Sequence, residues 1–314
     1  MDDFRIYSPE EVIASNLFET ARRFDTVCEQ ELAHLRELAL QIAEEGELSE
    51  LLASLPDHTP PRFSADERVP AKNKAMLESL QAIRGTWRSV ILCTELRRVL
   101  EVRHLLPTGF FFPDAEEIPT NAFHRIVYQK SSYTDSAYLK LSPLLSDPRV
   151  AYAHGFPSVC EEVYNGHCEF CILPVENSSE GQLNSFFRLI ERYELKIAAT
   201  CDVLGNDGGR VTRFALLRKN LLPLLAPESA SYPRRFECVL PPEDLATVSN
   251  LMVAAQLCGL RLSYVNSLPQ LGDSSRYNTH FSFFTKGGDL QAFLLYLAME
   301  VPHYTPIGLY PHLA

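Results

Sequence analysis

Two short polar segments contain residue types that could bind a negatively charged ligand. The first consists of Glu176, Asn177, Ser178 and Ser179, and the second of Thr212, Arg213 and Phe214. The amide and hydroxyl groups of the first segment are hydrogen-bond donors, and an arginine can hold a carboxylate through two parallel hydrogen bonds. The Thr212 hydroxyl can donate a hydrogen bond or relay a proton. The two segments therefore indicate a carboxylate-binding site.

The elements around the first segment favour this interpretation. An apolar run at 170–175 predicts a strand buried in a parallel sheet, and a helix is expected from Ser185 to Tyr193. Ligands of open α/β sheets bind at the carboxyl ends of strands, and the N–H groups at a helix start attract anions. Two simpler alternatives stay open: the polar residues only cap the helix, and Arg213 is only an exposed surface arginine.

The middle of the chain, residues 122–222, alternates between strand and helix patterns. Strands are expected at 125–129, 150–153, 170–175, 195–200 and 211–217, and helices at 132–145, 156–165 and 185–193. Residues 201–211 are expected to be a linker. The alternation predicts an α/β domain.

The two ends of the chain have other patterns. Residues 1–121 predict an all-α helical domain, with one helix from Ser8 to near Gly46 and a second from about Pro70 to His104. Long helices with few turns favour a bundle that a partner subunit completes. Residues 223–314 predict a βαββαβ, ferredoxin-like domain of the α+β class, with a polar loop between strands at 260–266 and 279–285.

The composition of the chain argues against some classes of binding partner. The chain has 29 Lys and Arg against 40 Asp and Glu, a net charge of −11 that disfavours nucleic acid and anionic membranes as partners. Neither a secretory signal nor a transmembrane run is expected, so a cytoplasmic location is predicted. Cys168 and Cys171 are interpreted as buried structural thiols on opposite faces of a strand, and no metal site is expected.

Taken together, the Glu-Asn-Ser and Thr-Arg-Phe segments resemble prephenate dehydratase, and residues 125–129 and 133–137 are similar to the opening strand and helix of that family. Residues 233–314 resemble the ACT domain, which senses phenylalanine in the family. The helical segment at the start of the chain, within residues 1–121, resembles chorismate mutase. The order of the three parts is therefore similar to that of the bifunctional chorismate mutase/prephenate dehydratase proteins. The resemblance implies a periplasmic-binding-protein-like fold for the middle domain.

The resemblance also implies a function in phenylalanine biosynthesis. Prephenate would lose carbon dioxide and water to become phenylpyruvate, without metal or organic cofactor, in a homodimer. The ligand would be a dicarboxylate, prephenate or chorismate, with phenylalanine as effector. By resemblance the catalytic residues are Thr212, Arg213 and Glu176. The substrate would contact Asn177, Ser178, Ser179 and Phe214, and the effector Leu245, Ala246, Asn266 and Ser267.

One departure from the family leaves a second function open. Only 35 residues separate Asn177 from Thr212, and a helix and a strand already use about 24 of them. The second lobe of the dehydratase domain, which forms the other wall of the family's cleft, is therefore predicted to be missing. The alternative is a catalytically impaired relative that acts as a ligand-binding or regulatory protein.

Overall fold

The structure is a computed structural model that describes residues 26, 29–41, 43, 71–102, 124–178, 181–205, 209–221, 234–241, 245–270 and 273–313. The chain divides into two compact units, residues 1–105 and 106–314. The expected helix start at Ser8 lies outside the described residues.

The first unit contains two described helical segments, residues 29–41 and α3 (Ala71–Val102), and α3 confirms the helix expected from Pro70. Both segments bury part of their surface, including Leu35 and Leu96. Ion pairs join the segments: Arg36 Nε lies 3.4 Å from Glu95 Oε2, and Arg88 pairs with Glu31. Both arginines therefore have an acidic partner on the other helical segment.

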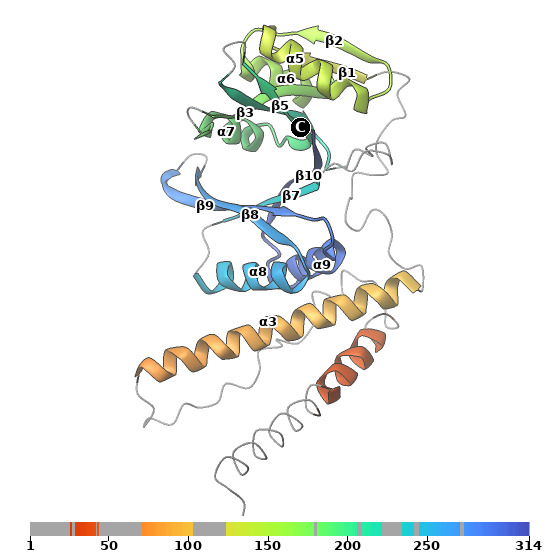
Figure 1. The fold of residues 1–314 in the computed structure, drawn as a ribbon, viewed down its shortest axis with the longest axis vertical. Helices are drawn as coiled ribbons and strands as arrows, with labels where there is room; N and C mark the ends of the chain where they lie inside the picture. Colours follow the sequence, from red (N-terminus) through yellow and green to blue (C-terminus); the bar gives the residue numbers. More distant parts are fainter. Residues whose placement is uncertain are drawn as a thin grey trace, which may run out of the picture. The chain divides into compact units, whose positions relative to one another are not determined.

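The second unit is built on one sheet of ten strands (Figure 1). The strand order is β2-β1-β3-β6-β5-β10-β7-β9-β8, with β4 paired to β3. The strands are β1 (His124–Tyr128), β2 (Pro148–Tyr152), β3 (Phe170–Asn177), β4 (Gly181–Gln182), β5 (Lys196–Leu204), β6 (Val211–Arg218), β7 (Arg234–Leu240), β8 (Arg261–Gln270), β9 (Asp273–Phe284) and β10 (Thr305–Leu313).

Helices cover both faces of the first half of this sheet. α5 (Ser132–Leu141) packs with one buried apolar cluster, and α6 (Phe156–Tyr164) and α7 (Asn184–Arg192) pack with another. The expected alternation of strands and helices is confirmed. β3 is buried as predicted, because it has a partner strand on each side. The expected parallel sheet is wrong: β3 pairs in parallel with β1 but antiparallel with β6, so the sheet is mixed.

The second half has the element order β7, α8 (Leu245–Leu257), β8, β9, α9 (Leu290–Glu300), β10. Its strand order, β10-β7-β9-β8, is that of a ferredoxin-like split unit. The aromatic rings of Phe281, Phe283 and Phe293 form its buried core. Figure 1 shows α8 and α9 together on one face of these strands. The polar loop expected after 266 is wrong: β8 continues to Gln270, and β9 starts at Asp273.

Strand β10 joins the two halves, because it pairs in parallel with β5 and antiparallel with β7. The approach to β5 is close at Gly308, where an added Cβ would lie 2.6 Å from the Ile197 carbonyl oxygen. A residue with a side chain would therefore clash at this position, and only glycine allows the two strands to approach so closely.

Two further details differ from the sequence expectation. β5 continues through residues 201–204, where a linker was expected. Cys168 precedes β3, so the two neighbouring thiols do not lie on opposite faces of a strand; both are buried in one apolar cluster, as free cysteines. No helix in the described part of the chain is long and apolar enough to span a bilayer.

Candidate functional site

The antiparallel pairing of β3 with β6 brings the two polar segments together. Glu176 is opposite Arg213, and Asn177 is opposite Thr212. Both pairs lie at the edge of the sheet where β1, β2, β3 and β5 have their carboxyl ends. β1, β2 and β3 run parallel to one another. β5 runs in the same direction, because β6 is antiparallel to both β3 and β5. This is the edge where ligands bind in open α/β sheets.

Arg213 is held between two carboxylates. Its Nη1 donates to Glu176 Oε2 at 2.7 Å, and its Nε donates to Asp202 Oδ1 at 2.9 Å. A longer contact of 3.4 Å joins Nη2 to Asp202 Oδ2. The side chains are 25%, 38% and 28% exposed for Arg213, Glu176 and Asp202, so Glu176 is the partner most open to replacement.

His312 and Thr200 extend this arrangement from β10 and β5. His312 Nε2 lies 3.4 Å from Asp202 Oδ2, and its Nδ1 lies 3.0 Å from Thr200 Oγ1. We call these five side chains the Arg213 cluster: Glu176, Thr200, Asp202, Arg213 and His312.

The charges of the Arg213 cluster shift the acidity of Asp202. Burial alone would raise the pKa of Asp202, but the hydrogen bonds from His312 and Arg213 and their positive charges outweigh burial. The pKa of this carboxyl is therefore held well below its ordinary value. Burial would lower the pKa of Arg213, and the hydrogen bond and charge of Asp202 raise it instead.

The sheet separates the predicted site residues onto two faces. Side chains alternate along β6, so Arg213 lies on one face and its neighbours Thr212 and Phe214 on the other. Phe214 is buried in the apolar cluster that includes Ala137 and Leu141 of α5. The structure thus brings Arg213 together with Glu176, and Thr212 together with Asn177, at one sheet edge but on opposite faces.

The segment after β3 does not lead straight into a helix. Ser178 pairs with the start of β6: its backbone N–H donates to the Val211 carbonyl, and its Oγ accepts from the Val211 N–H at 3.1 Å. β4 then pairs back onto β3, and α7 begins at Asn184 with Leu183 at its N-cap. Ser178 therefore does not cap α7, and the expected position of the serine-rich segment directly at a helix start is wrong for this residue. Ser179 lies outside the described residues.

The four residues expected at the effector site lie in the second half. Leu245 and Ala246 form the first turn of α8. Asn266 and Ser267 lie in β8, where Asn266 Oδ1 accepts from the Ser267 N–H at 2.9 Å.

A second polar cluster, which sequence reasoning missed, surrounds the buried Glu237. Glu237 Oε1 accepts from the hydroxyls of Tyr310 at 2.5 Å and Tyr264 at 2.9 Å, and its Oε2 lies 3.1 Å from His280 Nε2. We call these four residues the Glu237 cluster. Burial would raise the pKa of Glu237, but these hydrogen bonds, chiefly that of His280, hold it below its ordinary value.

Within the described residues, no group of three or more His, Cys, Asp or Glu side chains is arranged to hold a metal ion. In the Arg213 cluster the cation between Glu176 and Asp202 is the Arg213 guanidinium.

Comparisons with known proteins can now be set beside this geometry. Residues 127–206 match the family model of prephenate dehydratase. The matched range contains β3 and β5, and with them Glu176 and Asp202 of the Arg213 cluster. No curated protein matches the chain.

Two solved prephenate dehydratase structures are similar to this chain, and the first of them supports the same fold. The prephenate dehydratase of Streptococcus mutans is 18% identical, with a TM-score of 0.51, over 61% of this chain and 100% of that one. The prephenate dehydratase of Arthrobacter aurescens, solved in complex with L-Phe, is 14% identical, with a TM-score of 0.46, over 60% of this chain and 90% of that one. Residues 127–206 are therefore similar to the prephenate dehydratase domain, and the mixed α/β fold of the second unit is similar to that of the Streptococcus mutans structure.

Proposed function

We propose that this chain is a cytoplasmic protein of phenylalanine biosynthesis that binds prephenate and converts it to phenylpyruvate, water and carbon dioxide. The observation that carries the proposal is the pairing of Glu176-Asn177 with Arg213-Thr212, at the carboxyl edge of a sheet whose strands β3 and β5 lie inside the family match. Both segments are the ones that resemble the family's site.

The chemistry requires groups for two tasks. The ring carboxylate leaves as carbon dioxide, and its electron pair forms the new ring double bond. The ring hydroxyl leaves as water and takes up a proton from a donor, the role that we assign to Thr212. Arg213 holds a substrate carboxylate, and Glu176, its more exposed partner, gives up the guanidinium when the substrate arrives.

The experiment that tests this proposal uses the purified full chain and prephenate, with phenylpyruvate measured over time. We expect Thr212→Ala to lower the rate by about 100-fold or more, because a positioned proton donor contributes that much. Ser136→Ala, which removes an exposed hydroxyl of α5, serves as the matched control and should keep the wild-type rate. If wild type forms no phenylpyruvate, the proposed dehydratase activity is wrong. If Thr212→Ala keeps the wild-type rate, the proposed role of Thr212 as proton donor is wrong.

A second candidate function is ligand binding without turnover. Two observations favour it: Arg213 already has two acidic partners, and Thr212 lies on the opposite face of the sheet. The short connection between Asn177 and Thr212 holds β4, α7 and β5, which are part of the main sheet and its covering layer. Calorimetry separates the candidates, because a binding protein gives heat with prephenate or chorismate but leaves both compounds intact.

The remaining parts of the proposal concern the whole chain. We assign residues 1–121 to a chorismate mutase-like helical domain, 122–222 to the dehydratase-like lobe and 223–314 to an ACT-like domain, in a homodimer. Phenylalanine would bind the ACT-like domain near the start of α8, at Leu245 and Ala246, and at Asn266 and Ser267 of β8. Loss of chorismate on incubation and heat on titration with phenylalanine test the first and last assignments.

A further inference from the structure

One face of the strands β7, β8 and β9 carries a row of polar and charged side chains. Arg235 and Glu237 of β7 both lie on it, because side chains alternate along a strand. His280 and Phe284 of β9 lie on it as well, since the first contacts Glu237 and the second contacts Arg235. Helix α7 covers the middle of this face through the contact of Phe187 with His280. The two ends of the face differ in charge.

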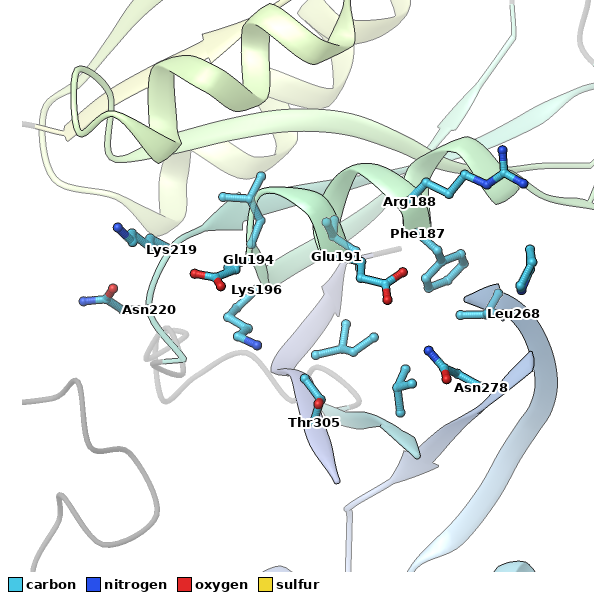
Figure 2. Close-up of a pocket in the computed structure, with 15 residues that line it drawn as sticks. Phe187, Arg188, Glu191, Glu194, Lys196, Lys219, Asn220, Leu268, Asn278 and Thr305 are labelled. Carbon is cyan, nitrogen blue, oxygen red and sulfur yellow. The ribbon is translucent and has the colours of Figure 1, made fainter. Parts of the chain in front are cut away.

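A cavity of ≈ 520 Å³ occupies one end, under α7, where β8 finishes and β9 begins (Figure 2). Side chains of both charges line it, among them Glu191 and Lys196. Lys196 donates its Nζ to the Pro306 carbonyl at 2.8 Å, and Figure 2 shows Glu191 facing the Asn278 amide. This mixture does not favour a ligand of one charge.

The opposite end of the face carries two arginines beside one aromatic ring. Phe284 is the cross-strand partner of Arg235 on β7 and of Arg261 on β8. The guanidinium carbon of Arg235 lies 4.7 Å from the centre of the Phe284 ring, and that of Arg261 lies 4.6 Å from it. Cation–π contacts of this length hold both guanidinium groups beside the ring. The two groups are therefore no farther apart than the sum of these distances.

Neither guanidinium group has an acidic partner in the part of the chain that the structure describes. Arg235 Nη1 makes one long contact, 3.4 Å, with the Ser263 hydroxyl, and its Nε is buried without a hydrogen-bond partner. Arg261 is exposed. Glu237, the acid of β7, is already enclosed by its own three donors. Two positive charges are thus close together without a counter-ion.

This arrangement favours a compact dianion. Like charges repel each other, and an anion beside both groups removes that repulsion. A guanidinium group offers several N–H donors in a planar fork that matches carboxylate and phosphate oxygens. A phosphate group has about two negative charges and several acceptor oxygens, so one group can accept from both arginines. A long polyanion is disfavoured instead by the net charge of −11.

We propose that Arg235 and Arg261 form a binding site for a phosphate group, either the free ion or a phosphate monoester. The phosphate oxygens accept hydrogen bonds from both guanidinium groups, which Phe284 holds in place. The site shares no residue with the Arg213 cluster and is independent of the proposed reaction on prephenate.

The probes are inorganic phosphate and phenyl phosphate, and the counterpart is acetate, a monoanion. Each is titrated into the full chain at about pH 8, where both phosphates are dianions, and at equal ionic strength, with binding followed by calorimetry. We expect both phosphates to bind at least about tenfold more tightly than acetate, because only a dianion balances both arginines. Tighter binding of phenyl phosphate than of inorganic phosphate identifies an ester as the ligand, and binding that is no tighter identifies the free ion. Both outcomes support the site.

Three variants locate the binding. Arg235→Gln and Arg261→Gln should each weaken phosphate by about tenfold, the effect of one lost hydrogen bond to a charged group. Arg276→Gln is the matched control, because it removes the same charge from an exposed arginine near the start of β9. That position is roughly 25 Å from Phe284 along an extended strand, beyond the reach of screened surface charges. The control should leave binding unchanged.

The proposal fails if neither phosphate binds at about 10 mM, if acetate binds as tightly as phosphate, or if Arg235→Gln and Arg261→Gln bind like wild type. An equal loss in Arg276→Gln also overturns it, because binding would then follow the overall charge. Thermal unfolding guards against a folding defect. Since Arg261 is exposed, the unfolding temperature of Arg261→Gln should stay close to that of wild type.

Discussion

The Arg213 cluster and the Glu237 cluster use the same strand, β10, but in opposite ways. His312 of β10 belongs to the first, and Tyr310, two residues earlier, belongs to the second. In the first, a cation lies between two acids at a sheet edge, and every charged member is partly exposed. In the second, one acid is enclosed by three donors and is fully buried.

The buried Glu237 cluster therefore stabilises the fold, whereas the partly exposed Arg213 cluster can bind a ligand. Water cannot replace a partner of Glu237, so loss of any partner leaves a buried charge. Water or a substrate carboxylate can replace Glu176 beside Arg213, because that ion pair is exposed and contributes little to stability. Exposure, more than the number of charges, therefore decides which of the two clusters can bind a ligand.

The largest effect should come from the buried cluster. We expect Glu237→Gln to lower the free energy of unfolding by about 3 kcal/mol, because the three donors lose a charged acceptor inside the protein. Urea unfolding of the variant and of wild type measures it. A loss below about 1 kcal/mol would mean that water reaches this cluster, and the contrast with the Arg213 cluster would disappear.

A smaller effect is expected at the exposed cluster. Asp202→Asn removes the charged acceptor of Arg213 and His312 and should lower the free energy of unfolding by about 1.5 kcal/mol. The matched control, Glu176→Gln, should cost less than about 0.5 kcal/mol because this pair is more exposed. If both variants cost the same, the order of exposure within the cluster does not set its energetics.

The smallest effect is a difference in acid sensitivity. The pKa values of Asp202 and Glu237 are both lowered in the folded state. Their stabilisation is therefore complete above the unfolded pKa values near 4 and is lost as the pH falls below them.

Between pH 5 and pH 3, Glu237→Gln should lose about 1 kcal/mol less stability than wild type, since one of the two linked carboxyls is gone. Urea unfolding at the two pH values measures the difference. An equal loss in both proteins would assign the acid sensitivity to other carboxyl groups.

Sequence patterns predicted most of the helices and strands but not all of the side chains that meet in the two polar clusters. The apolar run at 170–175 and the stripe in 70–104 identified β3 and α3, because burial dictates their residue types. Asp202 was missed because polar residues at the end of a strand look like a linker, and β5 continues only because β6 and β10 pair with it.

His312 and the Glu237 cluster were missed for a related reason. Thr200 and His312 are 112 residues apart in sequence, and no local pattern indicates that β10 pairs with β5. Glu237 lies in a strand whose other side is apolar, so its acid looks like an ordinary solvent-facing residue. The face it occupies is covered instead: Phe187 of α7 packs against the His280 ring, with the ring centroids 4.8 Å apart. Such long-range coverage is set by topology.

The position of β10 also bears on how the protein is made. Residues 124–218 emerge from the ribosome well before β10, and at about 5–20 residues per second this interval lasts several seconds. During that time the edge of β5 that later receives β10 has no partner strand, and open strand edges invite pairing with other chains. A nascent chain of this protein is therefore most exposed to aggregation just before its last strand arrives, and that interval is when a chaperone would matter most.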